Sequence, residues 1–508
     1  MDDDRNFYRL FQTKKNMITK KPTLISSFAL IDAILLSIIL VVALSFRLYK
    51  VNIPLADYHS WRQVDTAAVA RNFVRDGFNL MSPRYDDLSA IESGIENPNG
   101  YRFVEFPIYN AIFAFFYKAY PGISIEAWGR ITTALFSLIT IAVLYYLCFK
   151  EVNRFTAVVT SGIYAVFPFF VYFSRVILPE TPALSLVMLS IFFLYKGTHR
   201  SIKESYSLIH VLFSAIFFAL ATLVKPTVIF YSLTLGFIFL SKEHFQIIKS
   251  WRFYLYFIIV FIPLLLWRNY IKAFPEGIPA NSWLIAYVNT YKGQENIFFR
   301  PAFFRWIFFE RIGQNMLGVY LSFFVLLGFF IKSKKYILHS VLISGLVYLF
   351  TFQGGNVQHE YYQTLILPGI AIMIGLGINS LFTNTKTFIN PFLCVILIIF
   401  ILAFAWFFSF YKVRDFYYYP PELPQIAKII RTLTPPNAKI VTDRMGDTTL
   451  LYLIDRKGSP GLNKGLKELK NMGYQYFVTL NSETIANTKK TELYKTVFEN
   501  AQFTLFSL

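Results

Sequence analysis

Ionisable side chains are concentrated between His59 and Gly77, where the sequence reads HSWRQVDTAAVARNFVRDG. VDTAAVARNF has a helical pattern, and Arg62 and Asp65 are three residues apart, so they share a face of that helix. Asp57 lies just before it, where a carboxylate can cap a helix N-terminus. A carboxylate here could act as a general base toward a hydroxyl or amine, and an arginine could bind an anion. A helix cap and a surface ion pair are the alternative interpretation.

Further ionisable side chains stand at the ends of apolar stretches along the chain. RFVEFPIYN contains Glu105 ahead of an aromatic and proline turn, and SRVILPETP places Arg175 and Glu180 on either side of a helix boundary. LVKPT leaves Lys225 between two apolar segments with hardly any loop, and a poorly solvated lysine favours an anionic partner. Arg268 in WRNY is a weaker candidate, because basic residues are common at helix ends.

The segment QHEYYQTLILP adds His359, Glu360 and Tyr361 at the start of another apolar stretch. Each segment also has a structural explanation: an interfacial helix start, a snorkelling basic side chain or an aromatic belt. No single segment is specific. Ionisable residues at membrane depth are costly and usually functional, so their gathering on one side of a membrane is the informative pattern.

The composition is that of a membrane protein. Of 508 residues, 55% are hydrophobic and only 16% are charged, against roughly 25% in soluble domains. The net charge of +19 does not indicate nucleic-acid binding, because the basic residues fall mostly between apolar segments, where they set topology. Cys148 and Cys394 lie inside apolar runs and the histidines are scattered, so neither a disulfide framework nor a Cys-rich or His-rich metal site is indicated.

Eleven apolar segments are predicted to span a membrane. They lie at 25–48, 127–149, 155–174, 178–195, 206–224, 226–241, 253–268, 313–331, 336–352, 362–381 and 389–411. The aromatic segment 105–121 is predicted to lie on the outer interface, because the basic loops alternate cleanly between the two sides only if it does not cross. The basic tail 1–24 is predicted to be cytoplasmic and not a cleavable signal.

These assignments predict an all-α polytopic bundle at 25–412, whose first outer loop, 49–126, holds interface helices. Residues 413–508 change character: a helix, a proline break and short strands alternate, which predicts a small α/β domain. This domain and all the ionisable segments described above then lie on the side opposite the cytoplasm.

That arrangement favours one kind of reaction. Cations at the outer mouth of a bundle suit a lipid-linked phosphate, and a carboxylate suits a base that deprotonates an acceptor. Transfer of a sugar from a polyprenyl phosphate needs both, because the departing phosphate must be neutralised while the acceptor attacks the anomeric carbon. Two basic side chains on the phosphate would stabilise the transition state by a few kcal/mol.

The motifs HSWRQVDTAAVARNF, EFPIYN, SRVILPET, LVKPT and HEYYQTLILP, in this order, carry a resemblance that covers most of the membrane region. The chain resembles the bacterial dolichyl-phosphate-mannose–protein mannosyltransferase-like glycosyltransferases of the GT-C superfamily, a group that includes the aminoarabinose transferase of lipid A. The resemblance implies a helical bundle with a large first outer loop, a polyprenyl- or dolichyl-phosphate sugar donor, and a site at the outer face. It also implies inverting transfer with an acidic residue of the first loop as base.

The sequence departs from the family pattern at one position. Many members carry an Asp-Glu pair about nine residues before an arginine; if that arginine is Arg71, Arg62 and Gln63 occupy the places of the pair. The base is then Asp65, which lies within the helix on the face of Arg62, or Asp57 as second candidate. Lys225 matches a lysine that binds the donor phosphate in the family.

The site residues follow from these matches. The general base is expected to be Asp65 or Asp57. The residues expected to bind the donor phosphate are Arg62, Lys225 and Arg268. The residues expected to line the site are His59, Trp61, Gln63, Glu105, Arg175, Glu180, His359, Glu360 and Tyr361.

The expected partners are membrane lipids, the polyprenyl-phosphate sugar and an acceptor of the cell envelope, with no nucleic acid. The expected location is the plasma (inner) membrane. The sequence does not identify a cofactor or a need for a divalent metal, and the family is mixed in its use of metals. Four carboxylates near the proposed mouth are compatible with a hard divalent cation: Asp57, Asp65, Glu105 and Glu180.

Two other functions are weighed against this one. A transporter or flippase of lipid-linked glycans would place charges at mid-membrane and show pseudo-symmetric halves, and the sequence has neither. An O-antigen ligase or polymerase would share the outer arginines but would use a pyrophosphate-linked donor. A purely structural membrane protein gives no reason for the one-sided charge.

Overall fold

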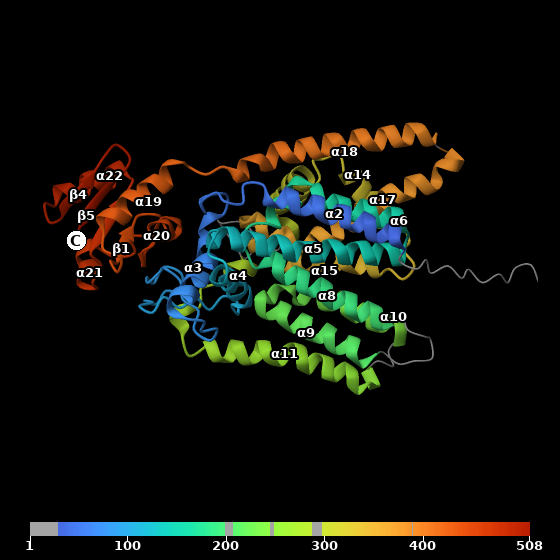
Figure 1. Ribbon diagram of the computed structural model, residues 1–508, viewed down its shortest axis with the longest axis horizontal. Helices are drawn as coiled ribbons and strands as arrows, with labels where there is room; N and C mark the ends of the chain where they lie inside the picture. Colours follow the sequence, from blue (N-terminus) through green and yellow to red (C-terminus); the bar gives the residue numbers. More distant parts are fainter. Residues whose placement is uncertain (1–28, 199–206, 244–247, 287–296, 389) are drawn as a thin grey trace, which may run out of the picture.

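The computed structural model describes residues 29–198, 207–243, 248–286, 297–388 and 390–508. A long bundle of helices carries irregular chain, short helices and a small sheet domain at one end (Figure 1). Among the described residues, five helices are long and apolar enough to cross a membrane: Leu30–Leu48, Ile125–Glu151, Trp251–Ile271, Glu360–Thr383 and Pro391–Leu433. Three apolar helices are shorter: Leu208–Val224, Pro226–Ser241 and Ile337–Thr351.

The bundle is built from elements that follow the apolar segments of the sequence. They are α2 (Leu30–Leu48), α5 (Ile125–Glu151), α6 (Arg154–Val166), α7 (Pro168–Phe173), α8 (Glu180–Thr198), α9 (Leu208–Val224), η1 (Pro226–Tyr231), α10 (Ser232–Glu243), α11 (Trp251–Ile271), η5 (Arg305–Met316), α14 (Ser322–Phe330), α15 (Ile337–Thr351), η6 (Glu360–Ile366), α17 (Leu367–Phe388) and α18 (Pro391–Val413). A helix or two consecutive helices lie in each of the eleven predicted segments. Since only five meet the length and hydropathy of a span, the count of eleven stays a prediction.

One predicted span, 155–174, is broken into α6 and α7. Pro168 begins α7 and has no N–H to continue the helical ladder of α6. The carbonyl oxygens of Tyr164 and Ala165, which the break leaves without helical donors, accept hydrogen bonds of 3.0 and 2.9 Å from the buried guanidinium of Arg47. The arginine therefore supplies the donors that the proline removes.

Small residues bring helices of the bundle into close contact. A side chain at Gly328 of α14 would overlap the backbone of Met373 of α17, and one at Gly377 would overlap that of Phe324. Such glycines allow helices to approach closely in a membrane, where dispersion contacts rather than the hydrophobic effect hold helices together.

The first loop lies across the end of the bundle. It contains α3 (Ser60–Asp76) and α4 (Ile108–Ala119). With 12 residues, α4 is about 18 Å long, well short of the roughly 30 Å of a hydrocarbon core. This length agrees with the prediction that segment 105–121 does not cross.

The C-terminal part folds as an α/β unit around a five-stranded sheet of order β2-β1-β3-β5-β4. Its strands are β1 (Ile440–Thr442), β2 (Gly458–Ser459), β3 (Tyr476–Thr479), β4 (Lys495–Glu499) and β5 (Thr504–Ser507). Strand β1 pairs in parallel with β2 and β3, whereas β5 pairs antiparallel with β3 and β4. Its helices are α19 (Glu422–Leu433), α20 (Thr449–Ile454), α21 (Leu466–Asn471) and α22 (Ser482–Lys490).

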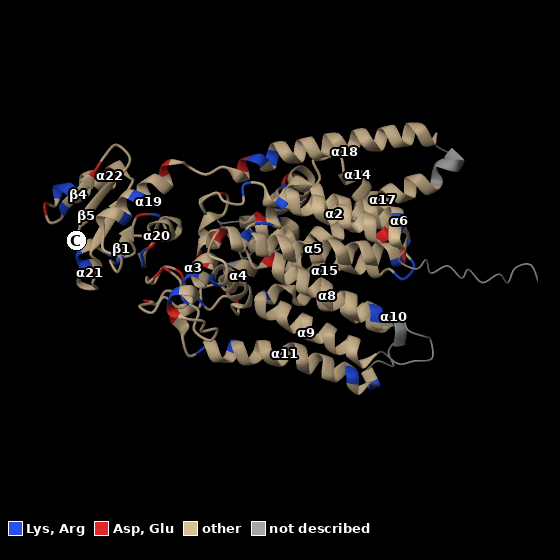
Figure 2. Ribbon diagram, in the orientation of Figure 1, with Lys and Arg blue, Asp and Glu red and all other residues tan. Residues whose placement is uncertain are grey.

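The first loop and the C-terminal sheet are joined by backbone pairing. The N–H of Leu88 donates to the carbonyl of Gly458 at 2.7 Å, and the N–H of Gly458 donates to the carbonyl of Asp86 at 2.9 Å. The loop thus covers the β2 edge of the sheet. Charged residues are sparse along the bundle and gather at its two ends, most of the acidic ones at the end with the loop and the sheet (Figure 2).

Candidate active site

Four buried or nearly buried ionisable side chains form a chain of ion pairs at the loop-bearing end of the bundle. The guanidinium of Arg62 contacts Glu105. Lys225 Nζ lies 3.3 Å from Glu105 Oε1 and 2.7 Å from Glu180 Oε1. The Glu180 side chain is 1% exposed, so its pairing with Lys225 compensates a buried charge. Burial opposes ionisation of Glu105, but Arg62 and Lys225 outweigh burial and lower its pKa.

Each member of this chain stands where a helix begins or ends. Arg62 lies in the first turn of α3, and Glu105 precedes α4. Lys225 ends α9 in an extended conformation, because Pro226 disfavours helical backbone at the residue before it. Glu180 opens α8, where the positive end of the helix dipole favours a carboxylate.

A cavity of about 510 Å³ opens beside these ion pairs. Glu105, Lys225 and Arg268 line it together with Tyr362, and the Lys225 ammonium lies 5.4 Å from the centre of the Tyr362 ring. The rest of its wall is largely apolar and includes Ile229, Phe230, Leu264, Leu284 and Phe352. Within the part of the chain that the structure describes, Arg268 makes no ion pair. The cavity can therefore hold an anionic head and an apolar chain.

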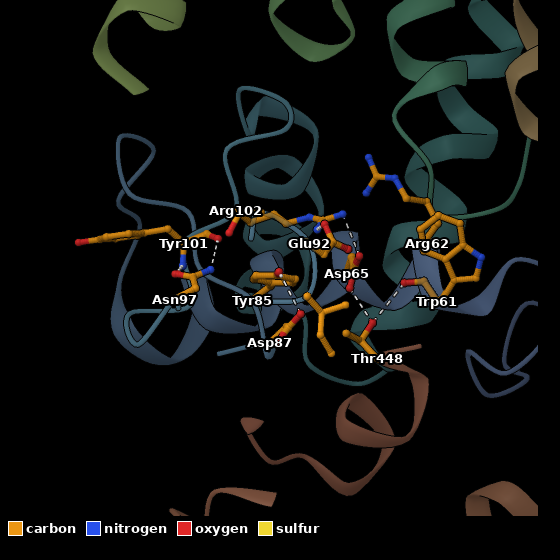
Figure 3. Close-up of polar contacts among 12 residues, drawn as sticks. Trp61, Arg62, Asp65, Tyr85, Asp87, Glu92, Asn97, Tyr101, Arg102 and Thr448 are labelled. Atoms are coloured by element: carbon orange, nitrogen blue, oxygen red, sulfur yellow. Dashed lines mark hydrogen bonds and ion pairs between the residues drawn. The ribbon is translucent and has the colours of Figure 1, made fainter. Parts of the chain in front are cut away.

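Asp65 is near Arg62 but does not line the cavity that holds Lys225 and Arg268. Its Oδ2 is 2.8 Å from Arg102 Nη2, and its Oδ1 accepts a hydrogen bond of 2.6 Å from the hydroxyl of Thr448 (Figure 3). A small hollow of about 10 Å³ is lined by Asp65 and Arg102 together with Glu105 and Arg62. Burial raises the pKa of Asp65 to about 7, against the opposing effect of Arg102. A carboxylate that titrates near neutral pH can act as a general base.

The interpretation of Arg62 and Asp65 as a surface ion pair is wrong. Both side chains are buried, and Arg62 extends away from Asp65 toward Glu105 (Figure 3). Their spacing does give them a common side of α3, but Arg62 and Asp65 each bind a partner that lies some 40 residues further along the chain, Glu105 and Arg102 respectively. Helical spacing alone does not determine which of two nearby charges a side chain selects.

Asp57 is held in a different cluster, and it does not cap α3. His59 occupies the N-cap position, and Asp57 Oδ1 accepts a hydrogen bond of 2.9 Å from the amide of Gln63. The same oxygen lies 3.5 Å from Arg130, and the hydroxyl of Tyr172 donates to Oδ2 at 3.4 Å. These contacts tie the start of α3 to α5 and α7.

Arg175, which was expected to line the site, lies with the Asp57 cluster and not with the ion-pair chain. It is fully buried, donates to the carbonyl of Lys50 at 2.8 Å and lies over the ring of Tyr417 at 5.0 Å. Gln63 is likewise buried and accepts from the N–H of Ile177 at 3.2 Å. Both residues connect segments of the scaffold and do not line the cavity of Lys225.

The remaining expected residues form an aromatic and acidic cluster beside α3. Glu360 accepts from Tyr58 at 2.8 Å, lies 2.9 Å from His59 Nε2 and pairs with Arg311 at 3.1 Å. The rings of Trp61, His59 and Tyr361 pack around His359. Burial, and then the neighbouring His59, lowers the pKa of His359 to about 4, which keeps its imidazole neutral at pH 7.

The sequence did not single out four residues that hold these clusters together. They are Arg102, Arg130, Arg311 and Thr448. Arg102 lay in a quoted motif but was given no role, and Arg311 lay between the predicted spans 253–268 and 313–331. Arg130 stands inside a predicted span, where a fully buried arginine is a signal that could have found it.

The four carboxylates that were considered compatible with a divalent cation do not come together as one group. Each faces a cationic side chain: Asp57 faces Arg130, Asp65 faces Arg102, and Glu105 and Glu180 face Lys225. Across the described ranges, no three side chains of His, Cys, Asp or Glu are placed to hold a metal ion. The donor set does not fit a metal, and no step is assigned to one.

Sequence comparison identifies one family. The family described as dolichyl-phosphate-mannose-protein mannosyltransferase matches residues 107–267, which run from the start of α4 into α11. A search of curated proteins found no match.

Solved structures match over nearly the whole chain. ArnT from Cupriavidus metallidurans bound to undecaprenyl phosphate has a TM-score of 0.63 and 13% identity, with 94% of this chain and 97% of that chain covered. The Archaeoglobus fulgidus oligosaccharyltransferase in complex with Zn and sulfate has a TM-score of 0.58 and 11% identity, covering 88% and 67%. The arabinofuranosyltransferase AftD from Mycobacteria has a TM-score of 0.56 and 12% identity, covering 94% and 39%.

The three solved structures match the fold of this chain, which is that of the GT-C glycosyltransferases. Its apolar helices make it a multi-pass membrane protein. The resemblance predicted from the motifs is confirmed. The chain has the GT-C fold, and residues 107–267 match the mannosyltransferase family.

Proposed function

We propose that the protein is an integral-membrane glycosyltransferase that moves a sugar from a polyprenyl phosphate to an acceptor of the cell envelope. One observation carries the proposal. The cavity of about 510 Å³ has apolar walls for a prenyl chain and holds Lys225 and Arg268 for a phosphate, directly beside Arg62 and Glu105. The solved relative with 13% identity was crystallised with undecaprenyl phosphate, a ligand of the same chemistry.

The side chains divide the proposed reaction between them. Lys225, Arg268 and Arg62 bind the phosphate and stabilise the charge that grows on it. Asp65 accepts the proton of the acceptor hydroxyl or amine, whose freed electron pair attacks the anomeric carbon. The bond from that carbon to the phosphate oxygen breaks, the polyprenyl phosphate leaves with the electron pair, and the configuration at carbon inverts.

The proposal includes an orientation. In it, the basic tail 1–24, which lies outside the described residues, is cytoplasmic, and the first loop and residues 413–508 are on the outer side of the plasma (inner) membrane. The ion-pair chain, Asp65 and the sheet domain all lie at the same end of the bundle, so the donor and the acceptor meet there.

Transfer is expected to depend on pH through Asp65. Its pKa of about 7 lies above the ordinary aspartate value, so the carboxyl is protonated at acidic pH and cannot accept a proton. The rate at saturating donor should fall about tenfold for each pH unit below 7 and level off above it. The pH profile of single-turnover transfer measures this. A rate that stays constant from pH 5 to pH 8 would exclude Asp65 as the base.

Arg268→Ala is expected to raise the KM for the donor about tenfold and to change the rate at saturation much less. The reason is that the arginine supplies a charge-assisted contact to the phosphate, of the order of 1.5–3 kcal/mol. Lys272→Ala is the matched control. It removes the same charge about one helical turn away, and Lys272 does not line the cavity. Equal KM values for the two variants would place the phosphate elsewhere.

The function itself is tested by a transfer assay. Radiolabelled polyprenyl-phosphate sugars are incubated with the purified protein and an envelope extract. Movement of label to an acceptor with release of polyprenyl phosphate is the expected result. Release of a polyprenyl pyrophosphate from a pyrophosphate-linked donor would replace the proposal with a ligase or polymerase. Movement of intact donor across vesicles, without release of any lipid phosphate, would replace it with a flippase.

A further inference from the structure

We propose that Thr448 is a positioning residue for Asp65, so that the C-terminal domain completes the active site of the membrane domain. The inference rests on the proposed function, in which Asp65 is the base. Thr448 stands 383 residues after Asp65 in the chain, at the start of α20.

The contact between the two residues is short and enclosed. Thr448 Oγ1 lies 2.6 Å from Asp65 Oδ1, and Thr448 and Asp65 are 2% and 1% exposed. Thr448 Oγ1 is 3.4 Å from the carbonyl of Trp61, so the shorter contact to the carboxylate takes its single proton. Arg102 Nη2 lies 2.8 Å from Oδ2 as an ion pair without hydrogen-bond geometry, so the hydroxyl of Thr448 provides the directed contact to the carboxylate.

The position of Thr448 in its own helix supports the inference independently. It is the N-cap residue of α20, where a threonine hydroxyl normally accepts a hydrogen bond from its own helix. Here the Asp447 side chain accepts from the N–H of Thr449 at 2.8 Å, and the hydroxyl of Thr448 is directed to Asp65 (Figure 3). The capping function is thus performed by the neighbour, which leaves the hydroxyl available to another domain.

Further contacts hold α20 along α3 and so fix the place of Thr448. The Thr449 hydroxyl is 2.9 Å from that of Ser60. Arg71 donates to the carbonyl of Tyr452 at 2.9 Å and pairs with Asp455 at 2.9 Å. The docking therefore spans more than two turns of α3, and Asp65 lies between Ser60 and Arg71 on that helix.

The hydroxyl has a defined effect on the base. A donor to an ionised carboxylate stabilises the charged form, and here it lowers the pKa that burial raises. Removing the hydroxyl should therefore keep Asp65 protonated to a higher pH, and it should also leave the carboxylate less well oriented.

Thr448→Val, Thr448→Ser and Thr449→Val test the inference in the full-length protein. Valine keeps the shape of threonine without its hydroxyl. In Thr448→Val we expect the acid limb of the pH profile to move upward and transfer at pH 6.5 to fall about tenfold, with the donor KM unchanged. Thr448→Ser should restore the parent profile. Thr449→Val, which removes a hydroxyl from the same docking contact, should leave the profile in place.

A second readout does not depend on transfer. The infrared band of the protonated carboxyl that disappears in Asp65→Asn can be titrated, and its midpoint should rise in Thr448→Val. An unchanged midpoint, or an equal shift in Thr449→Val, would overturn the inference. If the protein transfers no sugar, the proposed function fails, and the infrared titration still decides whether Thr448 controls Asp65.

Discussion

Asp65→Asn should slow sugar transfer by about 10²–10⁴-fold while leaving donor binding unchanged. Asparagine has the shape of aspartate and keeps an oxygen that can accept from Thr448, but it cannot take a proton from the acceptor. Asp65 is also absent from the lining of the cavity that holds Lys225 and Arg268. Single-turnover rates and donor binding measured on the same preparation separate the two effects.

Asp57→Asn is the matched control for that variant. Asp57 is bound by Gln63, Arg130 and Tyr172, so its replacement weakens a buried network and should lower the free energy of unfolding by about 1–3 kcal/mol. The rate per folded molecule should stay close to that of the parent. If Asp57→Asn abolishes transfer and Asp65→Asn does not, then Asp57 is the base.

Lys225→Met is expected to abolish transfer and to destabilise the fold together. The substitution removes one of the two cations that line the cavity, and it leaves Glu180, which is 1% exposed, as a buried charge without its partner. Breaking a buried ion pair from one side costs about 3–5 kcal/mol. Thermal unfolding in detergent and transfer at raised donor concentration measure the two losses.

The double variant Lys225→Met with Glu180→Gln separates binding from stability. Neutralising Glu180 removes the buried charge, so most of the stability should return. Transfer should remain absent, because the phosphate still lacks its lysine. A double variant that regains transfer would show that Lys225 serves the fold and not the donor.

The sequence predicted the gross arrangement well, for a physical reason. Hydrophobic length and local pattern depend on nearby sequence, so the helical bundle and the α/β character of the tail could be recognised. The non-spanning position of segment 105–121 and the side on which each loop lies stay predictions. The break of segment 155–174 at Pro168 was missed, since it also depends on Arg47, a residue more than 100 positions away that supplies donors to the freed carbonyls.

For the candidate site, the sequence named residues but not the partners that each residue contacts. Arg62, Glu105, Glu180 and Lys225 were all named, but their order in one ion-pair chain follows from the packing of α3, α8 and α9. Thr448 gave no signal of its own, because a threonine before a short helix reads as an ordinary cap. The sequence favoured Asp65 over Asp57 as the base, but it could not show that Arg102 and Thr448 surround the one and Gln63, Arg130 and Tyr172 the other.

The ion-pair chain also bears on how the enzyme would turn over. Its two cations are already matched by Glu105 and Glu180 before a donor arrives, so the resting cavity carries no uncompensated positive charge from them. A phosphate then gains only the difference between its own attraction to Arg62 and Lys225 and that of the carboxylate it displaces. In the proposed reaction, Glu105 and Glu180 compete with the phosphate of the spent carrier for the same two cations, which favours release of the carrier.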